Sequence, residues 1–478
     1  MRRGTIVAGS IVAAVTGCAA LAGLDDPSPV SDVGDAAGLD VATGDVAPGT
    51  DGGAGVDANI GYGSGAEGAV VITDKRNVNS YAPLAASAAV GATTLMIGNQ
   101  TTTATARKIA AGDVILIVQS ATPGVRPPGD AAALDTPVGV WELAVVVALD
   151  NTLVTLAQPL AHRFDAPGAQ IVRVPQTKTI EVTDSGALVA QKWDGNIGGV
   201  LALLATDSIV VDGALDSDSS GFRGGRAIDS EVVSGCNAGN GYVDAGFAPR
   251  GEGIGAVPAG YGDFFSGGRA NAANGGGGGD CLNAGGAGGG NGGRGGVGGN
   301  SNDSNRSVGG NGGAALNVPP GTSRLRFGGG GGAGDDNSST AGSGGTGGGV
   351  LFVRAPSLSG IGDVRARGGG GGGGADDGSG GGGAGGTVWL DLAMPPVCKR
   401  IAVGGGKGGD STGFTGPGGG GGGGVVFLRG GLSPTTCPVD FQAGGPGLCD
   451  GAAYGAGPPA DQRNQPPYIG LLSGDLSP

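Results

Sequence analysis

The sequence predicts an all-β fold: a small antiparallel β sandwich or barrel, followed by a glycine-rich β-solenoid or layered β repeat unit with polyglycine II-like tracts. Of 478 residues, 114 are Gly and 27 are Pro, and both residue types disfavour helix interiors. Runs rich in Val, Ile, Leu and Thr alternate with turn residues before residue 190, as in β proteins. Later strand-like runs recur between glycine tracts at a regular spacing, which indicates stacked β units.

The N-terminus has the features of a lipoprotein signal peptide over residues 1–17. Arg2 and Arg3 precede an apolar stretch from Thr5 to Val15, which as a helix rises about 16 Å, too short for a bilayer of about 30 Å. The following Val-Thr-Gly-Cys resembles a bacterial lipobox, so we expect Cys18 to carry the lipid that anchors the chain to a membrane. Ala19 after it resembles the signal for outer-membrane sorting.

Residues 18–68 are expected to form a disordered acidic tether. Between Leu24 and Gly68 there are eight Asp and one Glu and no Lys or Arg, so the segment has too little apolar surface to offset its ordering entropy.

Residues 69–190 are predicted to form the antiparallel β sandwich or barrel. Asp150-Asn151 is expected to be a tight hairpin turn, because both residues tolerate positive φ. The strands are expected at 94–97, 113–118, 141–149, 152–156, 170–174 and 179–182.

The glycine-rich repeat domain is placed at residues 191–450. Four copies open with Gly-Gly before a strand, at Gly198, Gly348, Gly385 and Gly423, and the last three start 37 and 38 residues apart. Each copy holds two strand candidates before it returns to glycine, as in a solenoid whose units bury one another. Residues 451–478 form a Pro-rich tail.

The glycine tracts are predicted to be ordered. A run such as Gly368 to Gly374 has no side chain to bury, so it is stable only if its backbone groups bond to neighbours. In the polyproline II form, strands without Cβ atoms can approach closely and bond in a bundle, and seven residues span about 22 Å. The alternative is that the tracts are flexible loops on a β core.

Aspartates recur in the glycine turns, where their oxygens are weak candidates for Ca²⁺ binding. The alternative is that they are solvated turn residues, since neither the EF-hand pattern nor the glycine-rich nonapeptide of calcium-binding β-helices is present. The candidates are Asp335, Asp336, Asp376, Asp377 and Asp410.

Composition excludes several other classes. The net charge of −14 argues against a nucleic acid partner. The one histidine, His162, has no Gly-x-Ser-x-Gly nucleophile to serve, so a structural role is expected. An exported chain favours disulfides, and pairing of Cys236 with Cys281 and of Cys398 with Cys437 would join neighbouring repeats. Cys449 is the fifth candidate, so two disulfides and one unpaired thiol are expected.

The competing enzyme hypothesis is a β-solenoid polysaccharide lyase or hydrolase. It needs clustered carboxylates with a basic residue beside them. One cluster on a strand-turn unit offers this: Asp207, Asp212, Asp216, Asp218 and Arg223. Because Asp beside Gly and Ser is also ordinary turn chemistry, we expect no enzyme activity and no catalytic residues.

Several strings are similar to glycine-rich bacterial surface lipoproteins of the kind labelled adventurous gliding motility proteins. They are GDVILIVQ at Gly112, VTLAQPL at Val154, IVRVP at Ile171, and the string from Trp193 to Gly225. The resemblance covers residues 90–430 and implies a surface or envelope location and a link to motility or adhesion. We therefore expect a lipid-anchored outer-membrane or cell-surface protein with a structural or adhesive role, whose partners are the membrane and a cell-surface glycan or another envelope protein.

Overall fold

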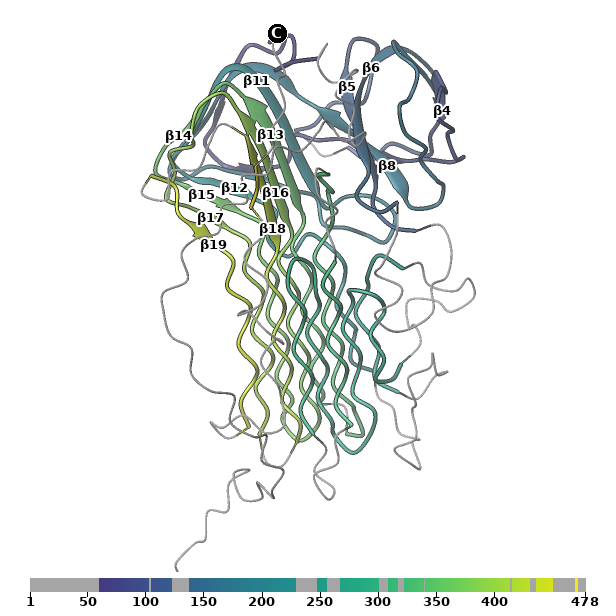
Figure 1. Cartoon of the computed structure of the whole chain (residues 1–478), viewed down its shortest axis with the longest axis vertical. Helices are drawn as coiled ribbons and strands as arrows, with labels where there is room; N and C mark the ends of the chain where they lie inside the picture. The colour runs from purple at the N-terminus through teal and green to yellow at the C-terminus, as the bar shows by residue number, and fades with distance from the viewer. Residues whose placement is uncertain are drawn as a thin grey trace, which may run out of the picture.

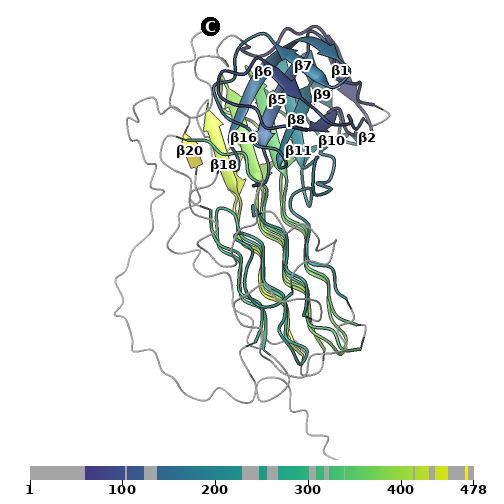
Figure 2. The same ribbon diagram turned by 90° about the vertical axis from the view of Figure 1, so that its right-hand side faces the viewer.

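The computed structural model contains β-strands and extended chain, with no helix in the part of the sequence that it describes. Three sheets form a head, and a bundle of glycine-rich tracts projects from it (Figures 1 and 2). The predicted all-β class is confirmed. The described residues are 60–102, 105–122, 137–228, 247–255, 267–300, 308–316, 322–338, 340–412, 415–429, 436–449 and 469–471.

One sheet of the head is antiparallel and curled, in the order β3-β8-β5-β6-β7-β4. Apolar cores cover both of its faces, so β5 is buried at every residue. The expected hairpin turn joins β6 to β7, with Asn151 at a φ of 52°. The strands are β3 (Tyr81–Pro83), β4 (Thr94–Met96), β5 (Val114–Gln119), β6 (Trp141–Asp150), β7 (Leu153–Leu156) and β8 (Ala169–Val174).

The other two sheets are parallel. The large parallel sheet has the order β1-β9-β11-β13-β16-β18-β20, with β14 paired to β11 off this path. Its strands are β1 (Ala69–Ile72), β9 (Gln176–Val182), β11 (Val200–Val211), β13 (Val350–Ala355), β14 (Leu358–Ser359), β16 (Thr387–Leu392), β18 (Val425–Arg429) and β20 (Ile469–Leu471).

The small parallel sheet has the order β19-β17-β15-β12-β10-β2. Each glycine repeat adds one strand to each parallel sheet, and so forms one coil of a solenoid. Its strands are β2 (Lys75–Arg76), β10 (Ala187–Val189), β12 (Ala214–Asp216), β15 (Asp363–Arg365), β17 (Arg400–Ala402) and β19 (Val439–Asp440).

The large parallel sheet is buried on both faces because its alternate residues enter two cores. Leu351 and Leu390 face the small parallel sheet, where Leu215 and Val364 complete the core. Phe352 and Trp389 face the antiparallel sheet. Neighbouring coils place them in register, and their rings stack with centroids 4.3 Å apart, with Trp141 edge-on at 5.1 Å from Trp389.

Two predicted boundaries differ from the structure. β1, β2, β9 and β10 lie in the parallel sheets, so residues 69–190 contribute to both parts of the head. Residues 60–68, assigned to the tether, pack on the head. Glu67 holds this segment against the head, because its carboxylate accepts hydrogen bonds from the buried Arg173 at 2.5 Å and from the Gln176 N–H at 3.0 Å. The carboxylate thereby compensates a buried guanidinium.

The glycine tracts bond to one another with a period of three residues, as expected for polyproline II-like chains side by side. The tract 378–386 shows the pattern, since every third N–H donates to the same neighbouring tract. The N–H groups of residues 380, 383 and 386 donate to the carbonyls of residues 372, 369 and 366 in one neighbouring tract. Those of residues 381 and 384 donate to residues 332 and 329 in a second tract, and those of residues 382 and 385 donate to residues 419 and 422 in a third.

The carbonyls of this tract accept bonds from three further tracts, so the tract has six hydrogen-bonded neighbours. Those tracts lie at residues 342–348, 406–409 and 286–289. The bundle is therefore an ordered lattice of backbone, which confirms the predicted ordered tracts over the alternative of flexible loops.

The lattice requires glycine because its chains lie too close for a Cβ atom. A Cβ on Gly381 would lie 1.9 Å from the Ala287 carbonyl oxygen, and one on Gly368 would lie 1.9 Å from that of Gly383. Most of the clashes inside the bundle are with backbone, which cannot move aside as a side-chain tip can. The long glycine runs therefore follow from the packing distance between chains.

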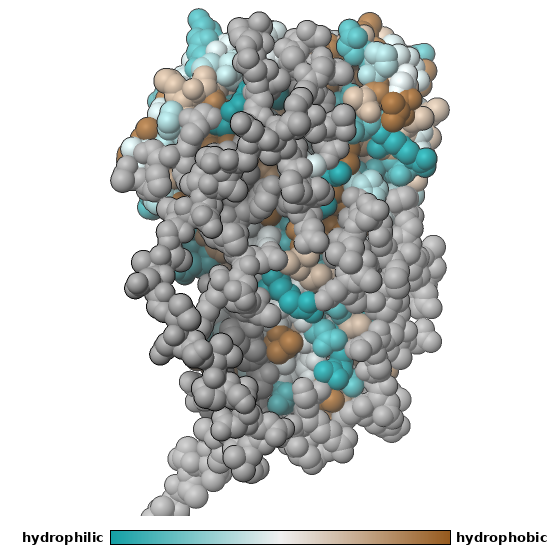
Figure 3. Space-filling model, viewed as in Figure 1, coloured by the Kyte–Doolittle hydropathy of each residue, from teal (hydrophilic) through white to brown (hydrophobic). Residues whose placement is uncertain are grey.

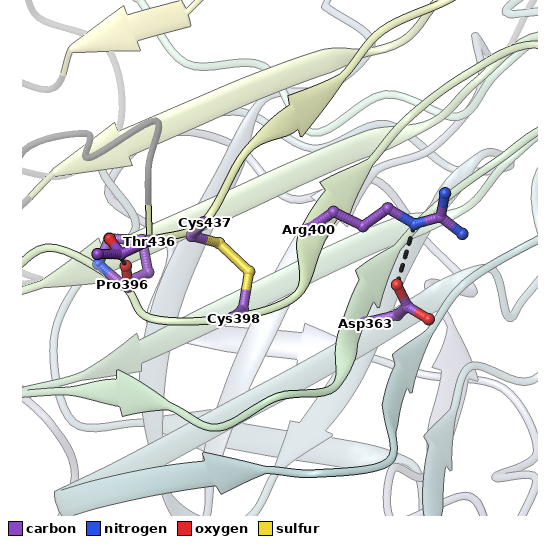
Figure 4. The surroundings of a disulfide bond; sticks show 6 residues. All are labelled: Asp363, Pro396, Cys398, Arg400, Thr436 and Cys437. Carbon is purple, nitrogen blue, oxygen red and sulfur yellow. Dashed lines mark hydrogen bonds and ion pairs between the residues drawn. A yellow bond between two sulfur atoms is a disulfide. The ribbon is translucent and has the colours of Figure 1, made fainter.

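A disulfide between Cys398 and Cys437 joins the coils of β17 and β19 (Figure 4). It is one of the two pairings that the repeat spacing favours; Cys236, in the other, lies outside the described residues. Cys281 and Cys449 are disulfide-bonded as well. The expected unpaired thiol is thus not among the cysteines of the described chain.

Candidate functional site

The acidic cluster predicted around β12 is divided between separate places. Asp216 and Asp218 share the outer face of the small parallel sheet, while Leu215 and Ser217, which alternate with them, are buried. Asp212 accepts a hydrogen bond from the Ile361 N–H at 3.3 Å in a turn. Of the other two members, Asp207 lies 3.8 Å from Lys178, and Arg223 pairs with Glu252.

Arginines of the next coil neutralise the carboxylates that remain together. Arg365 lies 2.8 Å from Asp216, and Arg367 lies 2.7 Å from Asp218. The hydrogen bonds to these carboxylates raise the pKa of both arginines above its usual range. This arrangement forms structural ion pairs along the sheet, because each carboxylate is held by a cation that does not release a proton.

Sequence reasoning missed these arginines, since each lies 149 residues from its aspartate. The signal was the alternation Asp-Val-Arg-Ala-Arg in the second strand of a repeat, which places Arg365 and Arg367 on the face that Asp216 and Asp218 occupy one coil earlier.

A hollow of about 410 Å³ lies where the small parallel sheet meets the bundle; we call it the joint hollow. It opens above Gly404, where no side chain fills the space between Arg367 and Gln442. Its lining is polar and has no aromatic ring. The residues that line it are Asp218, Ser219, Arg367, Gly368, Gly404, Gly405, Asp440, Gln442 and Ala443.

Below the joint hollow, the tract from Arg367 to Asp376 forms part of the bundle surface. Gly370 and Gly373 are exposed, and no hydrogen bond to their N–H or carbonyl groups is found within the described chain. Because the tract has three residues per turn, Arg367, Gly370, Gly373 and Asp376 lie along one line, which we call the outer glycine line. The side chain of Arg367 is 40% exposed, and Asp376 is exposed.

The turns that join the tracts lie at the far end of the bundle from the head, which we call the distal tip (Figure 1). They hold the predicted calcium candidates. Asp377 accepts hydrogen bonds from the side chains of Ser338 and Thr340, each at 2.8 Å. Burial alone would raise the pKa of Asp377, but these bonds and backbone N–H groups lower it.

Two other candidates differ in their electrostatics. The hydrogen bond with Lys407 lowers the pKa of Asp410. Burial raises the pKa of Asp335 to about 6, against the hydrogen bond from the Asn283 N–H, and Asp280 and Asp377 add to the rise. Within the described chain, no group of three or more Asp, Glu, His or Cys side chains is placed to hold a metal ion.

His162 lies on the head, with its Nδ1 atom 3.4 Å from Glu142. The Glu142 carboxylate is buried and also accepts hydrogen bonds from the Ala161 N–H, each oxygen at 3.0 Å. This carboxylate therefore organises the turn that carries the histidine.

The visible surface of the head mixes hydrophilic and hydrophobic residues (Figure 3). Over the head as a whole, the exposed large apolar side chains come from separate elements, and include Val71, Val90, Met96 and Val147. No helix among the described residues is long and apolar enough to cross a membrane. The predicted signal peptide and Cys18 lie outside the described residues, as does most of the tail.

Comparison with known proteins adds little. No protein-family model matches the chain, and no curated protein does. Among solved structures, the tailspike gp61 of Pseudomonas phage phi297 aligns with 11% identity and a TM-score of 0.16, over 80% of this chain and 60% of that one. The chain thus spans less than two thirds of that structure, and a likeness at this TM-score carries no argument.

Proposed function

We propose that this chain is a lipid-anchored cell-envelope protein with a structural or adhesive role, which presents its distal tip at the cell surface. Cys18 would carry the lipid, and the tether would separate the head from the membrane. The ordered glycine bundle would act as a rigid spacer between head and tip, because its lattice is bonded in every direction across the tracts.

The observation that carries this proposal is the position of the turns. Loops with polar side chains gather at one end of a rod whose body consists largely of glycine, so much of the exposed polar chemistry of the bundle lies where a surface partner would meet it. Asn337 and Thr412 are exposed in two of these turns. Such loops on a rigid scaffold are a common basis for binding.

Two experiments test the two halves of the proposal. For the anchor, cells expressing the full chain are labelled with radioactive palmitate. We expect the label and membrane association, and we expect Cys18→Ala to lose both. Equal labelling of this variant would contradict the anchor.

For adhesion, beads coated with the full chain are tested against cell-surface glycans and whole envelopes. Asn337→Arg at the distal tip is expected to lower retention, whereas Val90→Arg on the head, at a side chain that is 66% exposed, is the control. Equal loss in both variants would argue against a role of the tip.

The second candidate is a carbohydrate-active enzyme, which the joint hollow favours because Asp218, Arg367 and Asp440 line it together. Incubation of the chain with uronic-acid polymers distinguishes the two. New reducing or unsaturated ends support the enzyme, and binding without turnover supports the adhesive protein.

A further inference from the structure

One aspartate of the small parallel sheet lacks the ion pair that the others have. On the outer face of this sheet, aspartates of one coil pair with basic residues of the next coil. Arg365 lies 2.8 Å from Asp216, and Arg400 lies 3.0 Å from Asp363 (Figure 4). Asp440 lies on the same face, because it continues the register of Asp216 and Arg365. Since β19 is the last strand of the sheet, no following coil supplies a cation for Asp440.

The Asp440 carboxylate therefore keeps the capacity to accept hydrogen bonds. Among the described residues it accepts one, from the Gln442 N–H at 3.1 Å, and it has no ion pair there. An ionised carboxylate has about four lone-pair sites. Asp440 is half-buried and lines the joint hollow, so its remaining sites are available to the donors of a ligand in that hollow.

The joint hollow also carries hydrogen-bond donors. Arg367 donates through its Nε and Nη2 atoms to Asp218, at 3.0 and 2.7 Å. Its Nη1 atom takes no part in this pairing, and the side chain is 40% exposed. The Ser219 hydroxyl and the Gln442 amide line the same hollow, and each can both donate and accept. Donors and acceptors therefore surround one open space.

The floor of the hollow is backbone that faces outward. A Cβ on Gly405 would lie 2.1 Å from the Gly421 carbonyl oxygen, so the lattice requires glycine there. A Cβ on Gly404 would approach only Gln442, with its carbonyl oxygen at 2.8 Å. A side chain at Gly404 would therefore extend into the hollow. The volume of about 410 Å³ lies within the range of roughly 300–1,000 Å³ that is usual for small-ligand sites.

The pattern of donors and acceptors identifies the class of ligand. A simple cation would use Asp440 but would leave the donors of Arg367 and Gln442 without a partner. An anionic sugar would be repelled by Asp440, and Arg367 is already paired with Asp218. A sugar hydroxyl both donates and accepts. A neutral sugar can therefore bond to Asp440 and to the donors at the same time.

We propose that the joint hollow binds a neutral glycan, whose hydroxyls donate to Asp440 and accept from Arg367 and Gln442. This inference rests on the proposed adhesive role, in which a cell-surface glycan is a partner, but it uses a site away from the distal tip. The glycan is bound and not cleaved. Glycoside hydrolysis commonly needs two carboxyl groups at the scissile bond, and Asp218 is held by Arg367.

Isothermal titration calorimetry of the full chain tests the proposal. The probes are gluco-, manno- and galacto-oligosaccharides, and uronic-acid oligomers of the same length. We expect binding of at least one neutral series, with affinity at least roughly tenfold higher than that for the uronic-acid oligomers.

A conservative variant tests the role of the carboxylate. Asp440→Asn can still accept the Gln442 N–H, so the fold is kept, but hydrogen bonds to a charged acceptor are lost. The dissociation constant should rise roughly tenfold. Gln442→Ala should also weaken binding, because its side chain lines the hollow. Asp207→Asn is the matched control, since this carboxylate is 48% exposed and lies on the head outside the hollow. It should bind as the unmodified chain does.

Four results would overturn the proposal: no binding of any neutral series, stronger binding of the uronic-acid oligomers, equal affinities of the unmodified chain and Asp440→Asn, or new reducing ends in the titrated sugar. Asn337→Arg at the distal tip should leave the affinity unchanged. The tip proposal can therefore fail in the bead assay while the hollow still binds the sugar. A loss of affinity in Asn337→Arg would instead place the glycan at the tip and overturn the site proposed here.

Discussion

Within single glycine tracts, adjacent glycines have different surroundings. A Cβ on Gly371 would lie 2.0 Å from the Gly380 carbonyl oxygen, whereas one on its neighbour Gly370 would meet nothing nearer than the Lys407 carbonyl oxygen at 3.5 Å. The three-residue turn of the chain produces this difference, since one residue in each turn points into a given neighbour. Whether a given position must be glycine therefore depends on which neighbouring tract its Cα faces in the lattice.

A pair of alanine substitutions checks this difference. We expect Gly381→Ala to destabilise the chain by at least about 3 kcal/mol, because the methyl group must displace backbone that is bonded on all sides. Gly370→Ala should change stability by less than about 1 kcal/mol, since its φ is not in the left-handed region and the unfolded chain loses freedom. Chemical denaturation measures both, and equal effects would contradict the lattice.

At Asp335 burial raises the pKa, so the folded chain holds the carboxyl proton to a higher pH than the unfolded chain does. Its pKa is raised to about 6 from an ordinary value of 3.8. Between these values the folded chain binds more protons than the unfolded chain, so the contribution of Asp335 to stability falls as pH rises from about 4 to about 6. The cost above pH 6 is at most about 3 kcal/mol.

Asp335→Asn should remove this pH dependence and raise the melting temperature at pH 7.5, because the amide oxygen can still accept the Asn283 N–H. Melting curves of both proteins from pH 4 to pH 7.5 measure it. An identical slope in the variant would show that Asp335 does not hold the proton. Asp410 acts in the opposite sense. Because its pKa is lowered, it stabilises the fold at neutral pH, and this contribution is lost as the pH falls below the usual pKa of an aspartate.

At the scale of elements, the repeating unit is a coil with one strand in each parallel sheet and two glycine tracts in the bundle. The strand of the large sheet supplies apolar residues to two cores, and the glycine tracts extend the same register into the bundle. Since each coil buries its neighbour, the stability of the last coils depends on their contacts with one another.

The Cys398–Cys437 disulfide fixes two of these coils, with 39 residues of sequence separation. We expect Cys398→Ser/Cys437→Ser to lower stability by about 2–4 kcal/mol through the unfolded chain. The loss should appear first in β17 and β19, as faster hydrogen exchange there than in β5. If β5 loosened equally, the coils would be unfolding as one unit with the head.

How much of the fold the sequence predicts depends on whether the pattern is local. The strand pairs and the ordered tracts of the last three repeats follow from spacing alone, because these copies start 37 and 38 residues apart. Residues 275–300 and 308–316 are also glycine-rich but have no strand to mark their register. The structure places their tracts in the bundle, where the Asn274 and Asn291 side chains donate to backbone carbonyls.

The site was less predictable, because its contacts join distant coils. Asp216 and Asp218 were found from their own strand, but Arg365 and Arg367 come from a coil 149 residues later. The openness of Gly370 could not be found from a run of seven identical residues, since it depends on which neighbouring tracts exist. Only the assembled lattice distinguishes the outer positions of a tract from the inner ones.

At the scale of the whole molecule, a bundle of tracts projects from the head (Figure 2). Side-chain cores stabilise the head, and backbone hydrogen bonds stabilise the bundle. The two parts are continuous, because the same coils pass through both. A rod of this kind gives length and stiffness with few side chains, which suits the proposed surface role.

Residue-resolved hydrogen exchange of the native chain tests the account most directly. The amides of residues 380–385 are all bonded to neighbouring tracts and should be strongly protected, while those of Gly370 and Gly373 should exchange rapidly. This contrast, with its period of three along the tract 368–374, is the predicted result. Rapid exchange throughout residues 380–385 would contradict the ordered lattice on which the fold and both proposals depend.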